Sequence, residues 1–318
     1  MNILEIKNLN LAFNVQGKDF QALYDINLEV EKGKTLAIVG ESGCGKTMSA
    51  MSVIRLLPNN AKILSGEILY NGEDLLSFPE SRMCKIRGKE IAYIPQDPMT
   101  SLNPLYSIGN QIKEILEIHR GLKGKDADKA AIEVLEQVKI PRAKERLNNY
   151  PHEFSGGMRQ RVIIAMAIAC SAPVIIADEP TTALDVTVQA QIMDLLSEIQ
   201  KEYSTSIILI SHNLALVSQN SDSIVVMYAG HIVENSESKE LFDNPKHPYT
   251  KALLKSLPTL STKQLETIDG QPPSIREVFM GCPFEPRCSE KSAACKSQKP
   301  QTVLVNNSNV NCWRFCHD

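Results

Sequence analysis

The sequence predicts an α/β fold around a largely parallel sheet, followed by a small cysteine-rich C-terminal module. Three observations support this prediction. Short apolar segments alternate with helix-compatible segments from about residue 3 to residue 235, one apolar segment ends in a glycine-rich turn, and five of the eight cysteines lie in the last 37 residues. The 318 residues suffice for about two domains. With 43% apolar and 22% charged residues, the composition excludes a disordered or collagen-like chain.

Charge and hydropathy limit the partners that the chain can contact directly. The formal net charge of −3 gives no global basic field for nucleic acid. The first 15 residues carry charges and have no long apolar run, so we expect no signal peptide. The most apolar window, residues 162–177, is too short to cross a bilayer and contains Pro173. We therefore expect a chain that does not span a membrane and lies in a reducing compartment. In such a compartment, clustered cysteines indicate metal or redox ligands rather than disulfides.

Residue periodicity places the main elements. Short, apolar, β-branched runs predict buried parallel strands at residues 35–39, 91–94, 174–177 and 206–210. Apolar residues spaced i, i+3, i+4, i+7 predict helices around residues 131–138 and 192–199. A Tyr-Ala-Gly turn between two further apolar runs predicts a hairpin over residues 224–233.

The chain is expected to divide into an α/β domain over residues 1–245 and an extension over residues 246–318. Residues 97–160 are mostly helix-compatible and lie between predicted strands, which indicates an inserted helical subdomain. After about residue 245 prolines become frequent and periodicity fades. This change predicts a separate module with little regular structure.

The glycine-rich turn after the strand at residues 35–39 has the composition of a phosphate site. It reads G-x-x-x-x-G-K-T, the P-loop pattern, and comprises Gly40, Glu41, Ser42, Gly43, Cys44, Gly45, Lys46 and Thr47. Backbone N–H groups of such a turn surround phosphate oxygens at a helix N-terminus. Lys46 is expected to reach the β- and γ-phosphates of a nucleotide, and Thr47 to bind Mg²⁺.

Two carboxylates end the strand predicted at residues 174–177, about 130 residues after the P-loop. Asp178 suits the Mg²⁺ shell, and Glu179 suits a group that orients or deprotonates the attacking water. Acidic strand ends are common, so this interpretation depends on the P-loop that precedes them.

A second anion-binding helix start lies at Ser155, Gly156 and Gly157, before the apolar run at residues 162–170. With Gln160 these residues match S-G-G-x-x-[QR], and here the chain resembles the ABC transporter ATPases, whose signature motif this is. Phe154 stands where Leu more often precedes the serine, and both are apolar. The resemblance implies a P-loop ABC ATPase domain with a mostly parallel sheet core, an antiparallel β subdomain and a helical subdomain.

The resemblance also assigns residues to ATP and Mg²⁺. Gln96 follows the strand at residues 91–94, where the family has its Q-loop glutamine, and joins Thr47 and Asp178 around Mg²⁺. Asp185, in Thr-Ala-Leu-Asp after Glu179, corresponds to the D-loop aspartate. His212, which follows the strand at residues 206–210, corresponds to the switch histidine.

Two more features of the site follow from the same resemblance. Phe13 stands where the family has an aromatic residue that stacks on adenine, and Phe20 is the alternative. In ABC ATPases the signature of one subunit faces the P-loop of another. Ser155 and Gly157 would therefore bind the γ-phosphate of ATP held by a partner subunit.

The three cysteines before the tail have separate roles. Cys44 lies in the P-loop at a helix start, which lowers a thiol pKa, so it is either a reactive thiol or a small residue that fits the turn. Cys84 and Cys170 are expected to be structural.

The tail cysteines follow the spacing C-x5-C-x6-C-x16-C over Cys282, Cys288, Cys295 and Cys312, with Cys316 as a spare. This spacing matches neither the C-x2-C pairing of common zinc sites nor that of ferredoxins. Spacing alone therefore indicates a four-cysteine site and leaves the metal open.

The segments at residues 247–254 and 270–273, and the C-P-F-x-P-R-C segment from Cys282, resemble the C-terminal extension of oligopeptide and dipeptide ABC importers. This resemblance implies a [4Fe–4S] cluster on the four cysteines. Structural zinc, and free thiols or disulfides, are the alternatives. A metal on four cysteines would supply folding free energy to a segment with little core.

As a whole the resemblance implies the ATP-hydrolysing subunit of a peptide importer, peripheral on the cytoplasmic face of the membrane. The implied partners are two transmembrane permease subunits contacted through the helical subdomain, a paralogous ATPase subunit or a second copy, and an extracytoplasmic substrate-binding protein. The same machine importing nickel or a metal chelate is one alternative. A soluble ABC ATPase of chromosome maintenance or DNA repair is another, although only 108 positions without heptads separate Thr47 from Ser155. Against a non-transport binding module, Glu179 and His212 argue for turnover.

Overall fold

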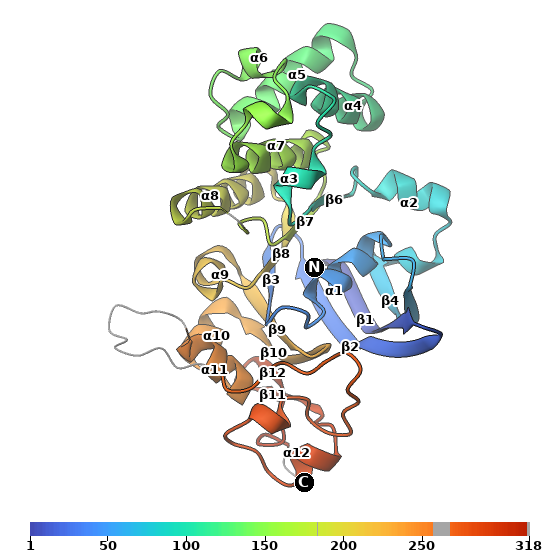
Figure 1. Ribbon diagram of the computed structural model, residues 1–318, viewed down its shortest axis with the longest axis vertical. Coiled ribbons are helices and arrows are strands. Elements are labelled where there is room, and N and C mark those ends of the chain that lie inside the picture. The colour runs from blue at the N-terminus through green and yellow to red at the C-terminus, as the bar shows by residue number, and fades with distance from the viewer. Residues whose placement is uncertain (183, 257–267, 317–318) are drawn as a thin grey trace. The chain divides into compact units, whose positions relative to one another are not determined.

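The computed structural model describes residues 1–182, 184–256 and 268–316, which form two compact units. The first unit comprises residues 1–31, 35–77 and the described residues from 210 onward. The second comprises residues 32–34 and 78–209. Within the described ranges, no helix combines the length and the apolarity that crossing a membrane requires. Figure 1 labels the helices and strands.

An antiparallel sheet of four strands, in the order β2-β1-β4-β5, forms part of the first unit (Figure 1). Its strands are β1 (Asn2–Val15), β2 (Lys18–Glu31), β4 (Ala61–Tyr70) and β5 (Glu73–Asp74). Leu4, Ile6, Leu9 and Leu11 of β1 are buried, because one face of the sheet packs on the core. The structure thus contains the antiparallel sheet that the family resemblance implies.

A second run of paired strands in the first unit carries the P-loop. In it β3 (Thr35–Val39) pairs in parallel with β9 (Ser223–Tyr228), and β9 pairs antiparallel with β10 (His231–Glu237). Every residue of β3 is buried, as expected for a parallel strand covered on both faces. The predicted hairpin is confirmed, since Ala229 and Gly230 form the turn between β9 and β10. The helices of the first unit between the P-loop and residue 255 are α1 (Lys46–Ile54), η1 (Leu75–Ser77), α9 (Leu214–Asn220), α10 (Ser238–Asp243) and α11 (Pro248–Lys255).

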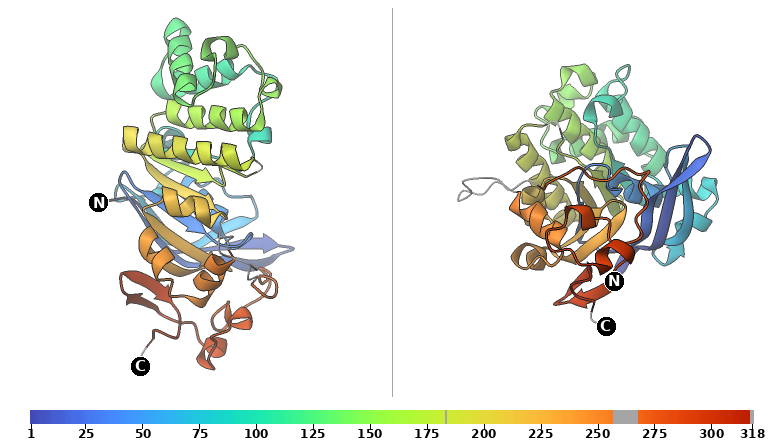
Figure 2. Two further views of the ribbon diagram at one scale, coloured as in Figure 1. Left: turned by 90° about the vertical axis from the view of Figure 1, so that its left-hand side faces the viewer. Right: turned by 60° about the horizontal axis from the view of Figure 1, so that its bottom comes forward.

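The extension contains more regular structure than predicted. After η3 (Glu285–Arg287) and α12 (Ala294–Ser297), β11 (Thr302–Val305) and β12 (Ser308–Asn311) form a hairpin, and β12 pairs with β10 (Figure 2). The buried carboxylate of Glu234 also accepts hydrogen bonds from the N–H groups of Lys246 and His247, at 2.8 and 2.9 Å. A separate, irregular module is therefore not confirmed, because strand pairing and this carboxylate join the extension to the first unit.

The second unit holds the predicted helical segment and the strands on either side of it. The parallel strands β6 (Ile91–Ile94) and β7 (Val174–Asp178) pair with Ile91 opposite Val174, and β8 (Ser206–Ser211) begins in this unit. Helices α4, α5 and α7 pack on one another (Figure 1). The predicted apolar stripes on α5 and α8 are buried. The helices are α2 (Glu80–Ile86), α3 (Pro98–Ser101), α4 (Ile108–Arg120), α5 (Gly124–Gln137), α6 (Ala143–Arg146), η2 (Pro151–Glu153), α7 (Gly156–Ala169) and α8 (Val186–Tyr203).

Candidate functional site

The P-loop forms the turn between β3 and α1, and packing leaves no room for side chains at two of its glycines. A Cβ on Gly40 (φ 150°) would meet the carbonyl oxygen of Met227 and lie 2.8 Å from Cys44 Sγ. A Cβ on Gly45 (φ 107°) would lie 2.5 Å from the Leu23 side chain. Gly45 is also the N-cap of α1, so the loop leads directly into a helix N-terminus. The loop therefore has the close packing and the helix start that a phosphate cradle requires.

Lys46 is the charged group of this loop. Its side chain is buried, and its ammonium donates to the carbonyl oxygens of Gly40 at 2.8 Å and Glu41 at 3.0 Å. Cys44 Sγ lies 3.9 Å from the same nitrogen. The positive charge is thus held against the loop whose N–H groups bind phosphate in proteins of this pattern.

The structure favours the second interpretation of Cys44, a small residue that fits the turn. The side chain is buried, and burial raises the pKa of the thiol despite the opposing effect of the Lys46 ammonium. The desolvation of a thiolate here outweighs the helix N-terminus. Cys84, expected to be structural, is exposed, which makes that expectation wrong, whereas Cys170 is buried as expected.

In the second unit, β7 ends at Asp178, the predicted Mg²⁺ ligand, and Glu179, the predicted base, follows it. Neighbouring side chains hold both carboxylates. The Tyr93 hydroxyl of β6 donates to Asp178 at 2.8 Å. Gln96 Nε2 and Thr182 Oγ1 both donate to Glu179 Oε2 at 2.9 Å. The structure thus brings the predicted Q-loop glutamine into direct contact with the predicted base.

The two carboxylates differ in their surroundings. Asp178 is 1% exposed, whereas Glu179 is partly exposed and has a φ of 45°, a conformation that costs on the order of 1–3 kcal/mol for a residue other than glycine. Sequence reasoning missed Tyr93, although a polar residue inside a buried strand needs a hydrogen-bond partner. Burial and the Asp178 charge raise the pKa of Tyr93, so its hydroxyl remains a donor.

The signature residues form the start of α7. Ser155 is the exposed N-cap, and its hydroxyl accepts from the N–H of Met158 at 3.4 Å. A Cβ on Gly157 would lie 2.6 Å from Val188 Cγ1, so α7 and α8 approach too closely for a side chain there. Gln160 is buried, and its amide nitrogen has no hydrogen-bond partner among the described residues. Of the motif's four predicted residues, Ser155 is therefore the exposed one and Gln160 the buried one.

The remaining predicted residues lie at element ends. Asp185 caps α8 and accepts from the Val188 N–H at 3.0 Å, while Ala183 of the same D-loop lies outside the described residues. His212 is exposed, directly after β8. Phe13 and Phe20 are opposite each other in the β1–β2 hairpin and both are partly exposed, so either ring is available on that hairpin.

Of the four tail cysteines assigned to one site, Cys282 is affected by the other three. Burial raises the pKa of Cys282 to about 12, and the thiols of Cys295, Cys312 and Cys288 add to this rise. The N–H of Cys282 also donates to the carbonyl of Cys295 at 2.8 Å, and none of the eight cysteines, all of which lie in the described ranges, forms a disulfide. Within residues 1–182, 184–256 and 268–316, no three or more His, Cys, Asp or Glu side chains are grouped so that they could hold a metal ion.

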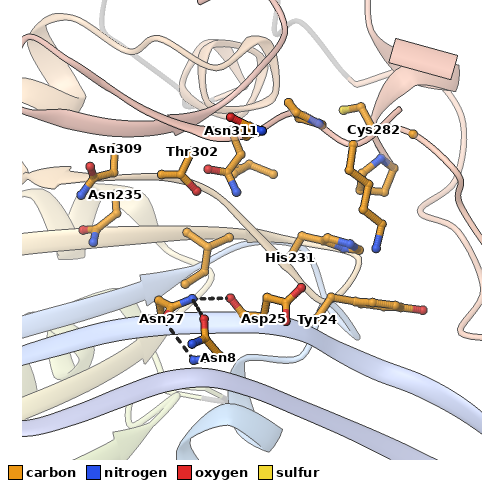
Figure 3. Close-up of a pocket in the computed structure, with 17 residues that line it drawn as sticks. Asn8, Tyr24, Asp25, Asn27, His231, Asn235, Cys282, Thr302, Asn309 and Asn311 are labelled. Carbon is orange, nitrogen blue, oxygen red and sulfur yellow. Dashed lines mark hydrogen bonds between the residues drawn. The ribbon is translucent and has the colours of Figure 1, made fainter. Parts of the chain in front are cut away.

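A cavity of about 580 Å³ lies in the first unit, beside the loop between Cys282 and Cys288, here called the cysteine loop. Figure 3 shows that its lining is rich in amides, among them Asn8, Asn27, Asn235, Asn309 and Asn311. His231 stacks on Tyr24 at the cavity wall, with ring centroids 4.3 Å apart. The N–H of the preceding residue, Gly230, donates to the carbonyl of Cys44 at 2.9 Å. The cavity wall and the P-loop are therefore connected through the turn before β10.

Sequence reasoning also missed a direct contact between the extension and the P-loop. Arg287 forms a two-point ion pair with Glu41, and the Tyr249 hydroxyl accepts from the Glu41 N–H at 3.0 Å. Contacts between residues so far apart in the chain leave no local pattern. A hint was the arginine inside the C-P-F-x-P-R-C segment, which the cysteine spacing did not explain.

This α/β fold carries a P-loop, a strand ending in two carboxylates and a signature helix start. Together these features define an ATP-binding cassette. The sequence profile of the ABC transporter family matches residues 23–182, about half of the chain. A second profile, the C-terminal region of oligopeptide/dipeptide transporters, matches residues 233–295. The chain therefore belongs to the ABC transporter family, in the group of ATP-binding proteins with this C-terminal region.

Similarity to known proteins extends over nearly the whole chain. The dipeptide transport ATP-binding protein DppD of Bacillus subtilis is 46% identical, and the alignment covers 98% of this chain and 94% of that protein. The oligopeptide transport ATP-binding protein OppD of Haemophilus influenzae is 44% identical, with 98% and 97% covered. Among solved structures, the dimeric bacterial ABC transporter cassette MJ0796 has a TM-score of 0.66 and 26% identity, and the match covers 74% of this chain and 98% of that one. The fold is that of a P-loop ABC ATPase.

Proposed function

We propose that this chain is the ATP-hydrolysing subunit that powers the import of dipeptides and oligopeptides by an ABC transporter. The observation that carries the proposal is the combination, in one chain, of both halves of an ABC ATPase site with the C-terminal region of peptide transporters. The names of the DppD and OppD relatives support peptides as the cargo. In this proposal residues 1–245 are the ATPase domain, with its helical subdomain at about 97–160, and residues 246–318 are the extension.

In this proposal the residues described above bind ATP and carry out its hydrolysis. Lys46 and the P-loop N–H groups bind the β- and γ-phosphates, and an aromatic ring at Phe13 stacks on adenine. Mg²⁺, when bound, neutralises charge on the phosphate oxygens, and its protein ligands are Thr47, Asp178 and Gln96. The hydrogen bond that Tyr93 donates supports this role for Asp178, since it fixes the carboxylate in the strand end.

Proton transfer is the role proposed for Glu179. Its carboxylate accepts a proton from the attacking water, and Gln96, which contacts it at 2.9 Å, orients that water. His212 acts at the γ-phosphate. The strained backbone of Glu179 supports a functional role, since such conformations persist where the surrounding structure holds them.

A dimer completes each nucleotide site in this proposal. Ser155, Gly156 and Gly157 of one subunit bind the γ-phosphate of ATP on the P-loop of the other, and hydrolysis releases these contacts. The exposed N-cap at the start of α7 and the dimeric structure of MJ0796 support this arrangement. The partner is a paralogous ATPase subunit, with a second copy of this chain as the alternative.

The helical subdomain is the proposed contact with two transmembrane permease subunits on the cytoplasmic face of the membrane. Large apolar side chains are exposed around α3 and the start of α4, namely Met99, Leu105 and Tyr106. Exposed apolar side chains that gather in one segment mark a protein–protein contact. An extracytoplasmic substrate-binding protein delivers the peptide to the permease subunits.

The extension is proposed to hold a [4Fe–4S] cluster on Cys282, Cys288, Cys295 and Cys312. Neighbouring tail thiols contribute to the raised pKa of Cys282, Cys288 and Cys312, which supports a common site. Structural zinc on the same four cysteines is the alternative. An anaerobic visible spectrum with iron and zinc analysis tests this proposal, and a colourless, zinc-loaded protein would contradict it.

Two alternative functions receive less support. The relatives named above carry peptide-transport names, which does not favour nickel as the cargo. A soluble ABC ATPase acting on DNA is disfavoured by the C-terminal region, which belongs to peptide transporters. Affinity purification of the tagged chain from cells tests the class: we expect permease subunits to co-purify, and recovery with DNA and without membrane proteins would refute the proposal.

A further inference from the structure

Glu41, the second residue of the P-loop, is held at three separate points. Its carboxylate accepts from Arg287 Nη1 at 2.7 Å and from Nη2 at 3.0 Å. Its backbone N–H donates to the Tyr249 hydroxyl at 3.0 Å, and its carbonyl accepts from Lys46 Nζ at 3.0 Å. Two of the three points come from residues after 245, so the extension contacts the loop that the nucleotide motif defines.

Every N–H group of the Arg287 guanidinium donates a hydrogen bond in this region. Besides the bonds to Glu41, Nη1 donates to the Tyr228 hydroxyl at 3.2 Å, Nη2 to the Ile268 carbonyl at 3.3 Å, and Nε to the Asp269 carbonyl at 2.8 Å. The five N–H groups of the guanidinium thus have five acceptors. The side chain is only 7% exposed, against 24% for Glu41, so the pair is sheltered from solvent and resists screening.

A buried aromatic cluster fixes the groups that hold Glu41. Tyr228, Tyr249 and Phe284 lie within 4.7 to 5.2 Å of one another, measured between ring centroids, and each is at most 2% exposed. Phe284 belongs to the loop between Cys282 and Cys288, and Arg287 is the last residue before Cys288. The cysteine loop therefore carries both the arginine that pairs with Glu41 and a ring that supports Tyr249.

We propose that Arg287 and Tyr249 are positioning residues of the nucleotide site, which make P-loop affinity depend on the folding of the Cys282–Cys288 loop. An unpaired Glu41 carboxylate would add negative charge next to bound phosphate, and Arg287 cancels that charge. Tyr249 fixes the peptide N–H at the same residue. The inference rests on the proposed function only in that the P-loop binds ATP, and it does not depend on which metal the cysteines hold.

A double-mutant cycle on the full-length chain tests the inference, with the dissociation constant of a fluorescent ADP analogue as the readout. We expect Arg287→Met to weaken binding about tenfold, because it leaves Glu41 charged and unpaired beside the phosphates. In Glu41→Gln/Arg287→Met that charge is absent, and we expect affinity to return to within about threefold of the wild type. Arg276→Met, which removes an exposed arginine of the same extension, should leave affinity unchanged.

A second comparison separates positioning from a general loss of folding. We expect Cys288→Ser to weaken nucleotide binding in the wild type and to have little further effect in the double variant, in which position 41 carries no charge that the loop must pair. Unchanged affinity in Arg287→Met, or losses that simply add in the double variant, would overturn the inference. A wild-type chain that failed to bind the analogue would instead contradict the proposed function.

Discussion

Replacing Glu179 by Gln changes one atom of the proposed base and little else. Glu179 Oε2 accepts from Gln96 and from Thr182, both at 2.9 Å, and the side-chain oxygen of a glutamine can accept both hydrogen bonds. The P-loop residues that bind phosphate are untouched. What is lost is the ability to take a proton from water, which is worth about 10²- to 10⁴-fold in rate, or about 2.7–5.4 kcal/mol of activation free energy.

The assay compares ATP turnover with ATP binding in the same preparation. We expect Glu179→Gln to reduce the rate of phosphate release by at least about 100-fold while the dissociation constant for ATP stays within about threefold of the wild type. Thr182→Val is the matched control, since it removes one hydrogen bond to Glu179 but retains the carboxylate, and should lose far less activity. Turnover at the wild-type rate in Glu179→Gln would refute the assignment of the base.

Three further variants test the packing at Gly157, the role of Tyr93 at the Mg²⁺ site and the burial of His247. Gly157→Ala should destabilise the fold by about 1–3 kcal/mol in urea unfolding, because its Cβ would lie 2.6 Å from Val188. Adding Val188→Ala should recover most of that loss. Equal stability of Gly157→Ala and the wild type would contradict the close packing of α7 on α8. Tyr93→Phe should raise the Mg²⁺ concentration for half-maximal activity by about 10- to 100-fold, and an unchanged Mg²⁺ dependence would remove Tyr93 from the site. Burial lowers the pKa of His247 from 6.5 to about 3, so the unfolded chain binds the extra proton below pH 6.5 and stability falls as pH falls. Between pH 7 and pH 5 the free energy of unfolding falls by about 2 kcal/mol through this group. This fall should vanish in His247→Asn and persist in His152→Asn. Identical pH profiles for the two variants would contradict the role of His247.

The elements that sequence predicted best are those whose pattern is local. Four buried strands, the amphipathic helices and the β9–β10 hairpin follow from periodicity over fewer than about twenty residues, a range in which chain geometry determines which face is buried. The P-loop was recognisable for a similar reason, because its whole residue pattern lies within eight consecutive positions. At Gly40 and Gly45 the neighbours are the Met227 backbone and the Leu23 side chain, which no local pattern reveals.

The features that sequence reasoning missed depend on contacts between distant segments. β12 contains Asn309 and Asn311, and its pairing with β11 and with the distant β10 makes this polar run a strand. The ion pair between Glu41 and Arg287 joins residues 246 positions apart. Cys44 shows the same limit for chemistry: the helix start was visible in the sequence, but the burial that raises its pKa was not.

The most direct test of the central claim is uptake of a radiolabelled dipeptide into proteoliposomes. The vesicles would contain the permease subunits and the partner ATPase of the same transporter, with its substrate-binding protein outside, ATP inside, and this chain as wild type or Glu179→Gln. We expect ATP-dependent accumulation of dipeptide with the wild type and near-background accumulation with Glu179→Gln. Equal dipeptide uptake with the wild type, with the variant and without this chain would contradict the claim that its ATP hydrolysis drives peptide import.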